Sequence, residues 1–237
     1  MIKTIFFYTS VVLSLIVSLL TLPWIYFLKL RGKTEERTQF IHKVTHAWAK
    51  FVMKVSGAKI TIKGLENIPK DQTVLFMANH QSFFDIPLLM SAIDVPKGFI
   101  AKKELAKWPG ISMWMRYIRC IFMDRDNLRK SAEAIVEGIN ILKSGYSMVI
   151  FPEGTRSKGG ETHEFKGGSF KLSTKPKVPI VPVTINGSYK LLERNDYKIK
   201  ADTVEVIIHP IIDVKTLTKE EIASLPEKVE KIILSRL

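Results

Sequence analysis

The 237-residue sequence has little cysteine, and this shortage excludes a protein stabilised by internal disulfides. Its single cysteine, Cys120, rules out an internal disulfide and fits a reducing compartment. The residues around Cys120 read as a buried strand, so we interpret this thiol as a core side chain rather than a nucleophile. No HExxH, paired CxxC or GxxxxGK[ST] pattern occurs, so neither a zinc enzyme nor a P-loop nucleotidase is indicated. There is also no internal repeat and no low-complexity segment.

Acidic residues are scarce as well. The chain has 23 Asp and Glu against 36 Lys and Arg, a formal net charge of +13. Such an excess indicates an anionic partner: nucleic acid, an anionic membrane surface or a phosphorylated substrate. Nucleic-acid binding would explain the charge but not the apolar N-terminal segment, and no recognised nucleic-acid motif supports it. We therefore expect no nucleic-acid partner.

Residues 5–28 form a long run without charge, dominated by large apolar side chains. At 1.5 Å per residue a helix of this length reaches about 36 Å, enough to cross a hydrocarbon core of roughly 30 Å. Pro23 is expected to kink or end the helix early, and Trp24 and Tyr26 are typical of a membrane interface. Cations follow at Lys29, Arg31 and Lys33. They predict a cytoplasmic location for the chain downstream. A cleaved signal peptide is the alternative, but the run is long and no small-x-small cleavage site follows it.

Residues 34–56 have apolar side chains spaced by one, three and four positions, which predicts an amphipathic helix ending at Gly57. The other face of this helix is basic, as in segments that lie in the headgroup plane of anionic lipid; an ordinary helix packed on the domain is the alternative. His42 and His46 have the i, i+4 spacing of metal ligands. Because no third ligand is nearby, we interpret them as polar-face residues. Residues 1–57 are thus predicted to be a membrane-associated, two-helix anchoring motif.

Residues 58–237 alternate between short apolar runs and helical patterns. Strands are expected at residues 59–63, 73–78, 98–101, 120–123, 147–151, 178–185 and 203–208. Helices are expected at residues 85–93, 127–142, 168–173 and from Thr218 onwards, with Thr218 a candidate N-cap. This alternation predicts an α/β domain with a mixed, largely parallel sheet covered by helices on both faces.

The loop between the strand at 73–78 and the helix at 85–93 carries a candidate catalytic pair, His80 and Asp85. Open α/β sheets place their chemistry at such strand ends. A histidine with a carboxylate nearby is a candidate general base with an orienting partner. A structural role is the alternative, because Asp85 is a good N-cap with Pro87 at position N2. The two roles are compatible, since a carboxylate has enough lone pairs for both.

Basic residues also lie at other predicted strand ends. In the turn at residues 151–157, Arg156 and the backbone N–H groups can bind a phosphate. Lys166 precedes a helix start at Gly167 and Gly168, which is a second anion site. Arg125 and Lys102 end two further strands. Each of these alone is typical of solvated surface, but four basic strand ends beside one candidate base indicate a site for an anion.

These blocks resemble the glycerolipid acyltransferases. Residues 79–85 match that family's N-H-x-x-x-x-D block, residues 151–157 its F-P-E-G-T-R-S block and residues 178–183 its V-P-I-V-P-V block. Residues 121–125 look like the block usually written G-x-I-F-I-D-R, with Arg119 where glycine is expected. The blocks occur in the family's order, and the chain is most similar to the bacterial 1-acylglycerol-3-phosphate (lysophosphatidic acid) acyltransferases.

The resemblance implies an activity and a set of residue roles. A fatty acyl group would pass from an acyl thioester to the sn-2 hydroxyl of 1-acylglycerol 3-phosphate, giving phosphatidic acid in phospholipid biosynthesis. His80 would act as general base oriented by Asp85. A thiolate leaves readily, so no metal or other cofactor is expected. The implied substrate-binding residues are Lys102, Arg125, Glu153, Gly154, Thr155, Arg156 and Lys166.

The resemblance also implies partners and a location. The partners are lysophosphatidic acid, acyl-acyl carrier protein or acyl-coenzyme A, and anionic membrane lipids. The location is the cell inner membrane, with the catalytic domain on the cytoplasmic face, and members of the family are described with a two-helix motif that enters one leaflet. Two alternatives stay open: a same-family enzyme using glycerol 3-phosphate or another lysolipid acceptor, and a non-catalytic membrane lipid-binding protein.

Overall fold

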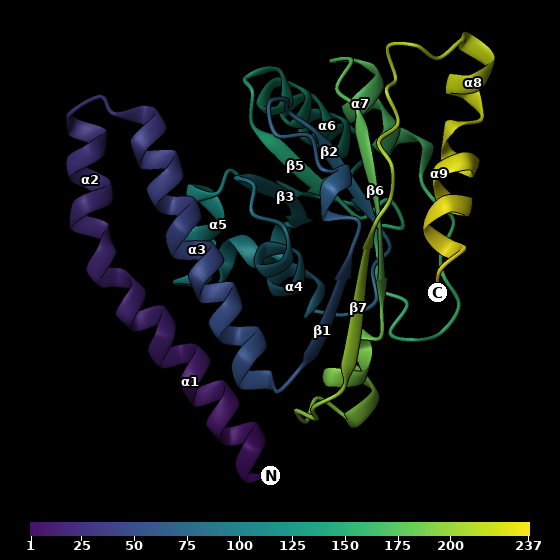
Figure 1. Cartoon of the computed structure of the whole chain (residues 1–237). Helices are drawn as coiled ribbons and strands as arrows, with labels where there is room; N and C mark the ends of the chain where they lie inside the picture. Colours follow the sequence, from purple (N-terminus) through teal and green to yellow (C-terminus); the bar gives the residue numbers. More distant parts are fainter.

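A seven-stranded sheet forms the centre of the computed structural model, which describes all residues from 1 to 237 (Figure 1). The strands are β1 (Lys59–Lys63), β2 (Leu75–Ala78), β3 (Lys97–Lys102), β4 (Ile121–Met123), β5 (Ser147–Ile150), β6 (Ile180–Asn186) and β7 (Thr203–Ile208). Their order is β1-β7-β6-β2-β5-β3-β4, and every neighbouring pair is parallel except β6 with β7. The predicted mixed, largely parallel sheet is therefore confirmed.

The central strand β2 is buried on both faces. Phe76 points into one core cluster, whereas Leu75 and Met77 point into the other, and none of the three is exposed. Leu75 lies opposite Met148 of β5 and Ile180 of β6. A strand covered on both faces reads as a continuous apolar run, which is why β2 could be recognised in the sequence.

Helices cover both faces of the sheet. One face carries α3 (Thr34–Ser56), α4 (Asp85–Ala92) and α5 (Ile111–Tyr117), and the other carries α6 (Leu128–Lys143), α7 (Lys171–Thr174) and α9 (Leu225–Leu234), with α8 (Lys219–Ala223) preceding α9. The helix α3 has the predicted bounds and ends at Gly57, whose φ of 78° suits glycine. Thr218 caps α8 in a capping box with Glu221, and Pro226 opens α9. The helix α5 was not predicted.

Two interpretations of single side chains can be compared with the structure. Cys120 is buried, and burial raises its pKa to about 12, so the thiol is protonated and fits the core role expected for it. The interpretation of His42 and His46 as polar-face residues is wrong. Both side chains are mostly buried, and Asp94, distant in sequence, lies beside them. Asp94 is therefore a third candidate metal ligand, which the sequence near His42 and His46 does not contain.

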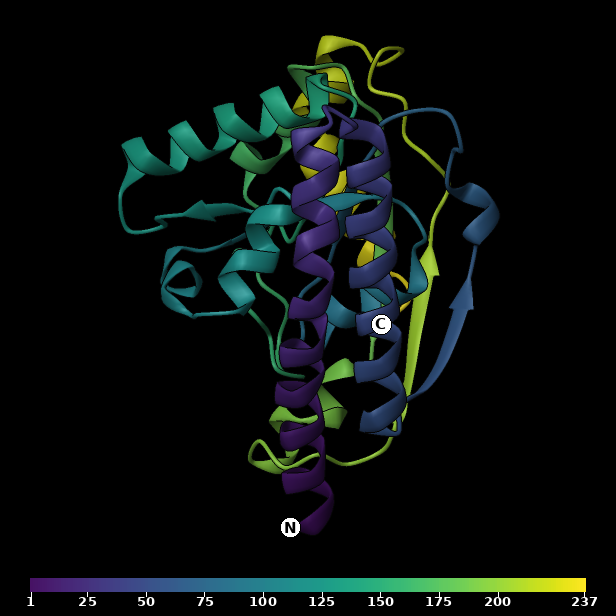
Figure 2. The ribbon, with the colours of Figure 1, turned by 90° about the vertical axis from the view of Figure 1, so that its left-hand side faces the viewer.

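The helices α1 (Ile2–Ser18) and α2 (Leu22–Leu30) form a nearly continuous rod that lies alongside α3 (Figure 2). Only a 3₁₀ turn, Leu19–Thr21, separates them, and Pro23 stands in the first turn of α2, where its ring is tolerated. Two indole N–H groups tie the rod to the domain: Trp48 donates to Ser14 Oγ at 3.1 Å and Trp114 donates to Ser18 Oγ at 2.9 Å.

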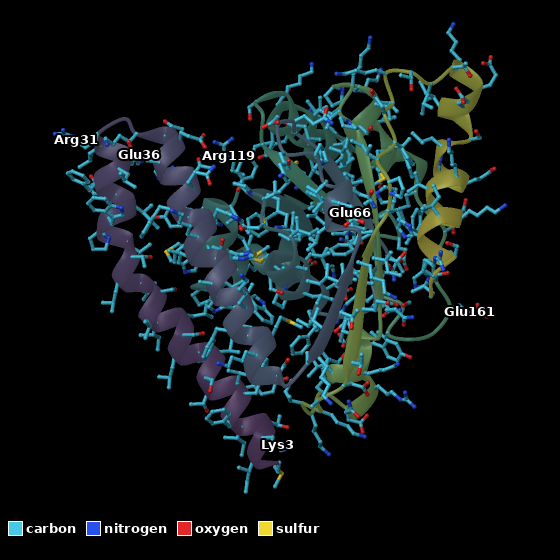
Figure 3. All side chains as sticks on the ribbon, viewed as in Figure 1. Lys3, Arg31, Glu36, Glu66, Arg119 and Glu161 are labelled. Carbon is cyan, nitrogen blue, oxygen red and sulfur yellow. The ribbon has the colours of Figure 1, made fainter.

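The outward side of this rod is apolar and exposed. It is long and apolar enough to cross a membrane, by length and composition, over Ile2–Leu30. Its exposed large side chains include Ile5, Phe6, Val12, Leu13, Ile16, Val17, Leu20, Trp24, Phe27 and Leu30. Charged residues stand at its ends, Lys3 at one end and Arg31 with Glu36 at the turn into α3 (Figure 3). A contiguous apolar surface of this kind marks a membrane or partner interface.

Candidate active site

The carboxyl end of β2 carries the candidate catalytic pair. His80 lies in the loop after β2, and its Nδ1 is 2.7 Å from Oδ2 of Asp85. The same oxygen accepts the backbone N–H groups of Gln81 at 2.7 Å and Ser82 at 2.9 Å, and Asp85 is fully buried. Because a carboxylate only accepts, it selects the tautomer of His80 that is protonated at Nδ1. The Nε2 atom is then left to accept a proton.

Asp85 does not serve as an N-cap, so that expectation is wrong. It is the first residue of α4, and its carboxylate points back to the loop at residues 80–82 rather than to the amides of the helix. Its second oxygen, Oδ1, accepts the hydroxyl of Ser188. Pro87 is correspondingly the third helical residue, not the second. Four donors therefore fix the carboxylate in the position where it meets the imidazole.

The turn after β5 holds His80 from its other side. Glu153 Oε1 accepts the backbone N–H of His80 at 2.6 Å, and the N–H of Ser157 donates to the His80 carbonyl at 2.9 Å. The ring of Phe151 stacks on the imidazole, with centroids 4.0 Å apart and planes 17° apart. The two sequence blocks that begin at Asn79 and Phe151 therefore form one interlocked unit.

Glu153 is a buried carboxyl group with both oxygens engaged. Its Oε2 accepts the N–H of His163 at 3.3 Å, while Oε1 holds His80. Burial raises the pKa of Glu153, and the two backbone hydrogen bonds act in the opposite direction because they favour the ionised form. His163 itself is exposed. Glu153 thus positions two loops through its two oxygens.

Two of the predicted phosphate-binding cations converge on Gly154. Arg125, at the carboxyl end of β4, donates from Nη1 to the carbonyl of Gly154, and burial lowers the pKa of its guanidinium. The Nζ atom of Lys166 lies 3.0 Å from the place that a Cβ on Gly154 would occupy. Gly154 has a φ of 73°, so a side chain there would be strained as well as crowded. Thr155 and Lys166 line an open cavity of ≈ 420 Å³ beside Glu153.

The other two predicted cations lie apart from this cavity. Arg156 Nη1 is 3.0 Å from Glu193 Oε1, and its guanidinium carbon stands 3.6 Å from the ring centroid of Phe83. Lys102 has a side chain that is 57% exposed and pairs with Glu104 at 3.5 Å. Arg156 therefore braces the loop that carries the candidate pair, whereas Lys102 stands in solvent at the end of β3.

Sequence reasoning missed two residues that support the pair. Ser188 binds Asp85, as described above. Glu193, whose side chain is 2% exposed, accepts the hydroxyl of Ser82 at 2.6 Å and the N–H of Phe83 at 2.8 Å in addition to Arg156. Neither residue has a local signal, because each lies more than 100 residues from its partner. The only available signal was the V-P-I-V-P-V block, which becomes β6 beside β2 and delivers the turn that carries Ser188.

Comparison with known proteins agrees with this geometry. The family model described as Acyltransferase matches residues 59–186, more than half of the chain. A 1-acyl-sn-glycerol-3-phosphate acyltransferase of Borreliella burgdorferi is 33% identical over 201 residues, which are 85% of this chain and 80% of that protein. The chain belongs to the acyltransferase family.

Further relatives of this acyltransferase extend to eukaryotes and to a solved structure. A 1-acyl-sn-glycerol-3-phosphate acyltransferase of Saccharomyces cerevisiae is 31% identical over 190 residues, which are 78% of this chain and 62% of that protein. The crystal structure of the 1-acyl-sn-glycerophosphate (LPA) acyltransferase PlsC from Thermotoga maritima superposes with a TM-score of 0.86. It is 31% identical, and the match covers 98% of this chain and 92% of that chain. The fold is thus that of PlsC over nearly its full length.

In this acyltransferase, Arg119 stands where the resemblance leads one to expect glycine. Its φ is 55°, a left-handed conformation that glycine adopts more readily. Its guanidinium lies 4.6 Å from the ring centroid of Tyr146, and its Nη1 is 3.3 Å from Ser144 Oγ. Arg119 and Tyr146 precede β4 and β5, so they lie at the amino ends of the strands. His80 lies at the opposite edge of the sheet, and the substitution therefore does not touch the candidate site.

Proposed function

We propose that the chain transfers a fatty acyl group from an acyl thioester to the sn-2 hydroxyl of 1-acylglycerol 3-phosphate, giving phosphatidic acid. The observation that carries this proposal is the pair of a buried Asp85 and a partly exposed His80, whose imidazole keeps Nε2 free of any hydrogen bond within the protein. The names of relatives in Borreliella burgdorferi, Arabidopsis thaliana and Saccharomyces cerevisiae support the choice of acceptor.

His80 acts as the general base. Its Nε2 takes the proton of the sn-2 hydroxyl as that oxygen attacks the thioester carbonyl carbon. The ester C–O bond forms, the C–S bond breaks, and the imidazolium gives its proton to the departing thiolate. Asp85 stabilises the imidazolium through the 2.7 Å contact with Nδ1. Such assistance is typically worth about 10²–10⁴-fold in rate, and no covalent acyl-enzyme is needed.

The acceptor phosphate binds between Arg125 and Lys166. A guanidinium has five N–H groups, so Arg125 can hold the Gly154 carbonyl and still donate to a phosphate. The turn formed by Gly154 and Thr155 shapes this pocket, and Glu153 joins it to the backbone of His80. Lys102 and Arg156 contribute differently: Lys102 adds positive charge at the end of β3, apart from this pocket, and Arg156 braces the loop through its ion pair.

We propose further that residues 1–57 anchor the enzyme in one leaflet of the membrane. The apolar rod stays against the rest of the chain, with its start on the domain and its end on α3. Near its start, Thr4 Oγ1 accepts the N–H of Ile199 at 3.2 Å, and the Tyr8 hydroxyl donates to the Tyr197 carbonyl at 3.2 Å. Near its end, Leu28 is 2% exposed. A helix that spans both leaflets would have to carry one end across roughly 30 Å of hydrocarbon, away from the domain.

This placement brings the catalytic loop to the lipid surface. The ring of Phe7, on α1, lies 5.6 Å from the ring of Phe84, which directly precedes Asp85. The net charge of +13 favours an anionic surface. The cations after α2 favour the cytoplasmic face of the inner membrane. Either acyl-acyl carrier protein or acyl-coenzyme A, both acidic, would suit the basic surface as donor.

Acyl transfer by purified protein in lipid vesicles tests the proposed function. A labelled acyl thioester of coenzyme A or of acyl carrier protein is offered with lysophosphatidic acid, or separately with glycerol 3-phosphate. We expect phosphatidic acid only from lysophosphatidic acid. The variant His80→Asn keeps an N–H for Asp85 but has no base, so it should lose about 10²–10⁴-fold in rate while its melting temperature stays unchanged. Transfer to glycerol 3-phosphate instead would show that the proposed acceptor is wrong. If folded protein transferred no acyl group to either acceptor, the proposed enzymatic activity would be refuted.

A further inference from the structure

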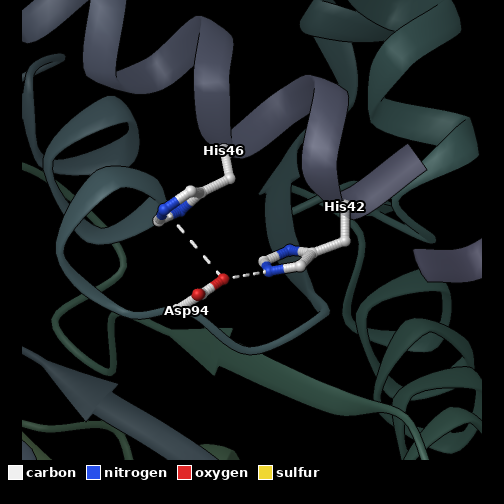
Figure 4. Close-up of side chains that lie close together, drawn as sticks. All are labelled: His42, His46 and Asp94. Carbon is white, nitrogen blue, oxygen red and sulfur yellow. Dashed lines mark hydrogen bonds and ion pairs between the residues drawn. The ribbon is translucent and has the colours of Figure 1, made fainter. Parts of the chain in front are cut away.

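A second cluster of chemistry-bearing side chains joins α3 to the segment after α4. His42 and His46 of α3 direct their rings at Asp94, which follows the last turn of α4 (Figure 4). Asp94 Oδ1 lies 2.7 Å from Nε2 of His42 and 4.0 Å from Nε2 of His46. One ligand atom from each of the three residues lies within 4.8 Å of the others. The cluster is at the opposite end of α4 from Asp85, so it is separate from the candidate active site.

The hydrogen bond of His46 to a backbone carbonyl leaves its other ring nitrogen facing this cluster. Its Nδ1 lies 2.7 Å from the carbonyl oxygen of Met90, and because a carbonyl only accepts, Nδ1 carries the proton. In the neutral ring Nε2 then holds a lone pair. This lone pair and the carboxylate of Asp94 are two acceptors that face one another across 4.0 Å. A cation between them would satisfy both.

The distances fit a small metal ion. With Zn–N bonds of about 2.0–2.1 Å and Zn–O bonds of about 2.0–2.2 Å, tetrahedral ligand atoms stand about 3.3 Å apart. The observed separations of 2.7 and 4.0 Å lie on either side of that value. The third separation, between the two imidazoles, lies within 4.8 Å, so the rings have to approach slightly while Asp94 turns. The Asp94 side chain is 78% exposed and has room to turn, whereas the side chains of His42 and His46 are 11% and 13% exposed. The hydrogen bond that Nδ1–H of His46 donates to a backbone carbonyl is of the kind that metal-binding histidines usually make with the ring nitrogen that does not bind the metal.

The charges around the cluster both favour and oppose a cation. Asp94 supplies one negative charge. Lys50 and Lys97 are the nearby opposing cations. Burial lowers the pKa of Lys97 to about 7, and its Nζ donates to the Ile93 carbonyl at 2.6 Å.

We propose that His42, His46 and Asp94 bind one divalent transition-metal ion, with Zn²⁺ the best match, and that this ion pins α3 to the segment after α4. Two imidazoles and one carboxylate are a donor set suited to Zn²⁺. Water completes the coordination on the exposed side of Asp94. On binding, Nε2 of His42 exchanges its hydrogen bond to Asp94 for the metal, and its proton moves to Nδ1. The ion takes no part in acyl transfer; its effect is on the stability of the contact between α3 and the domain.

Metal titration of the full chain tests this site. Untagged protein, stripped with a chelator and held in detergent micelles, is titrated with Co²⁺ and then with Zn²⁺. We expect one Co²⁺ per chain with the intense visible absorption of a four-coordinate site, and its displacement by Zn²⁺. Zn²⁺ should also raise the melting temperature, because it binds only the folded arrangement. His46→Ala and Asp94→Asn should each weaken binding by at least about 100-fold, since loss of a ligand exceeds the ~10–100-fold cost of losing an outer partner.

Two histidine variants outside the cluster serve as controls. His163→Ala removes an exposed histidine and should leave the Co²⁺ spectrum unchanged. His80→Asn should also keep the spectrum although it abolishes acyl transfer, so failure of the metal site and failure of the proposed enzyme are told apart. Folded protein that binds no Co²⁺ overturns the proposal. So does binding that persists unchanged in His46→Ala and Asp94→Asn, or a Zn²⁺-dependent rise in melting temperature that is equal in both variants.

Discussion

Replacing Asp85 by asparagine would separate the charge of this carboxylate from its hydrogen-bonding geometry. Oδ2 accepts three N–H groups, from the ring of His80 and the backbones of Gln81 and Ser82, and Oδ1 accepts the hydroxyl of Ser188. An asparagine can place its carbonyl oxygen where Oδ2 stands and its NH₂ group where Oδ1 stands. The NH₂ group then donates to the Ser188 hydroxyl oxygen, which is able to accept. The loop then keeps all of its hydrogen bonds. What is lost is the negative charge beside the imidazolium.

The expected effect follows from the strength of a charged hydrogen bond. Such a bond contributes about 1.5–3 kcal/mol, and each 1.36 kcal/mol is a factor of about ten in rate. Asp85→Asn should therefore lower kcat about 10- to 150-fold. The KM for the acceptor should change little, because we place the phosphate at Arg125 and Lys166 rather than at Asp85. Asp85→Ala should be worse in both activity and stability, since it leaves buried donors without an acceptor.

Initial rates measured against lysophosphatidic acid in vesicles, together with melting temperatures, provide the assay. The His80→Asn variant gives the lowest expected kcat, and the kcat of Asp85→Asn should lie between that value and the wild-type value. A folded Asp85→Asn protein with wild-type kcat would refute the reasoning. A raised KM at constant kcat would also refute it, because that pattern would make Asp85 part of the acceptor pocket and not the partner of the base.

Three further predictions follow from other parts of the structure. Arg125→Ala removes a charged donor to the acceptor phosphate, so kcat/KM for lysophosphatidic acid should fall about 10- to 150-fold; steady-state kinetics check this, and an unchanged value would remove Arg125 from the site. Lys97 has a folded-state pKa of about 7 against its usual 10.5, so the unfolded chain binds more protons above pH 7 and stability should rise with pH. Thermal unfolding at pH 7, 8 and 9 should show this rise in the wild type and not in Lys97→Met; equal slopes would contradict it. Above pH 9 Cys120, with its raised pKa, acts in the opposite sense and limits the window. Thr218→Ala breaks the capping box with Glu221 and should lower the free energy of unfolding by about 1 kcal/mol; denaturant unfolding checks it, and a loss no larger than in a surface Ser→Ala control would count against the cap.

The elements that could be predicted from the sequence are those with local causes. The helix α3 has a regular apolar spacing and a terminal glycine at Gly57, and its predicted bounds are the observed ones. The strand β1 follows from its own short run in the same way. The helix α5 has only seven residues, begins after Gly110 and has no side-chain cap, so no local sequence feature predicts it. Its position is set by Trp114, which packs into the core beneath α1.

The same distinction separates the parts of the candidate site. His80 and Asp85 lie five residues apart, so one loop suffices to bring them together. Ser188 lies 103 residues from Asp85, and Asp94 lies 52 residues from His42. These contacts depend on which strand lies beside which and on how α3 crosses α4. A single sequence carries no direct signal of either.

The position of β2 between β5 and β6 has a consequence for the nascent chain. Asn79 pairs through its side-chain amide with the backbone of Ile185, 106 residues further on, and the His80 backbone pairs with Glu153, 73 residues further on. At translation rates of about 5–20 residues per second, the loop around His80 waits roughly 5–20 s for these partners. The apolar rod of α1 and α2 has left the ribosome long before that. Each new molecule should therefore dock on the bilayer while its catalytic loop is still open, and ribosome-stalled chains that end before residue 185 should bind vesicles without transferring acyl groups.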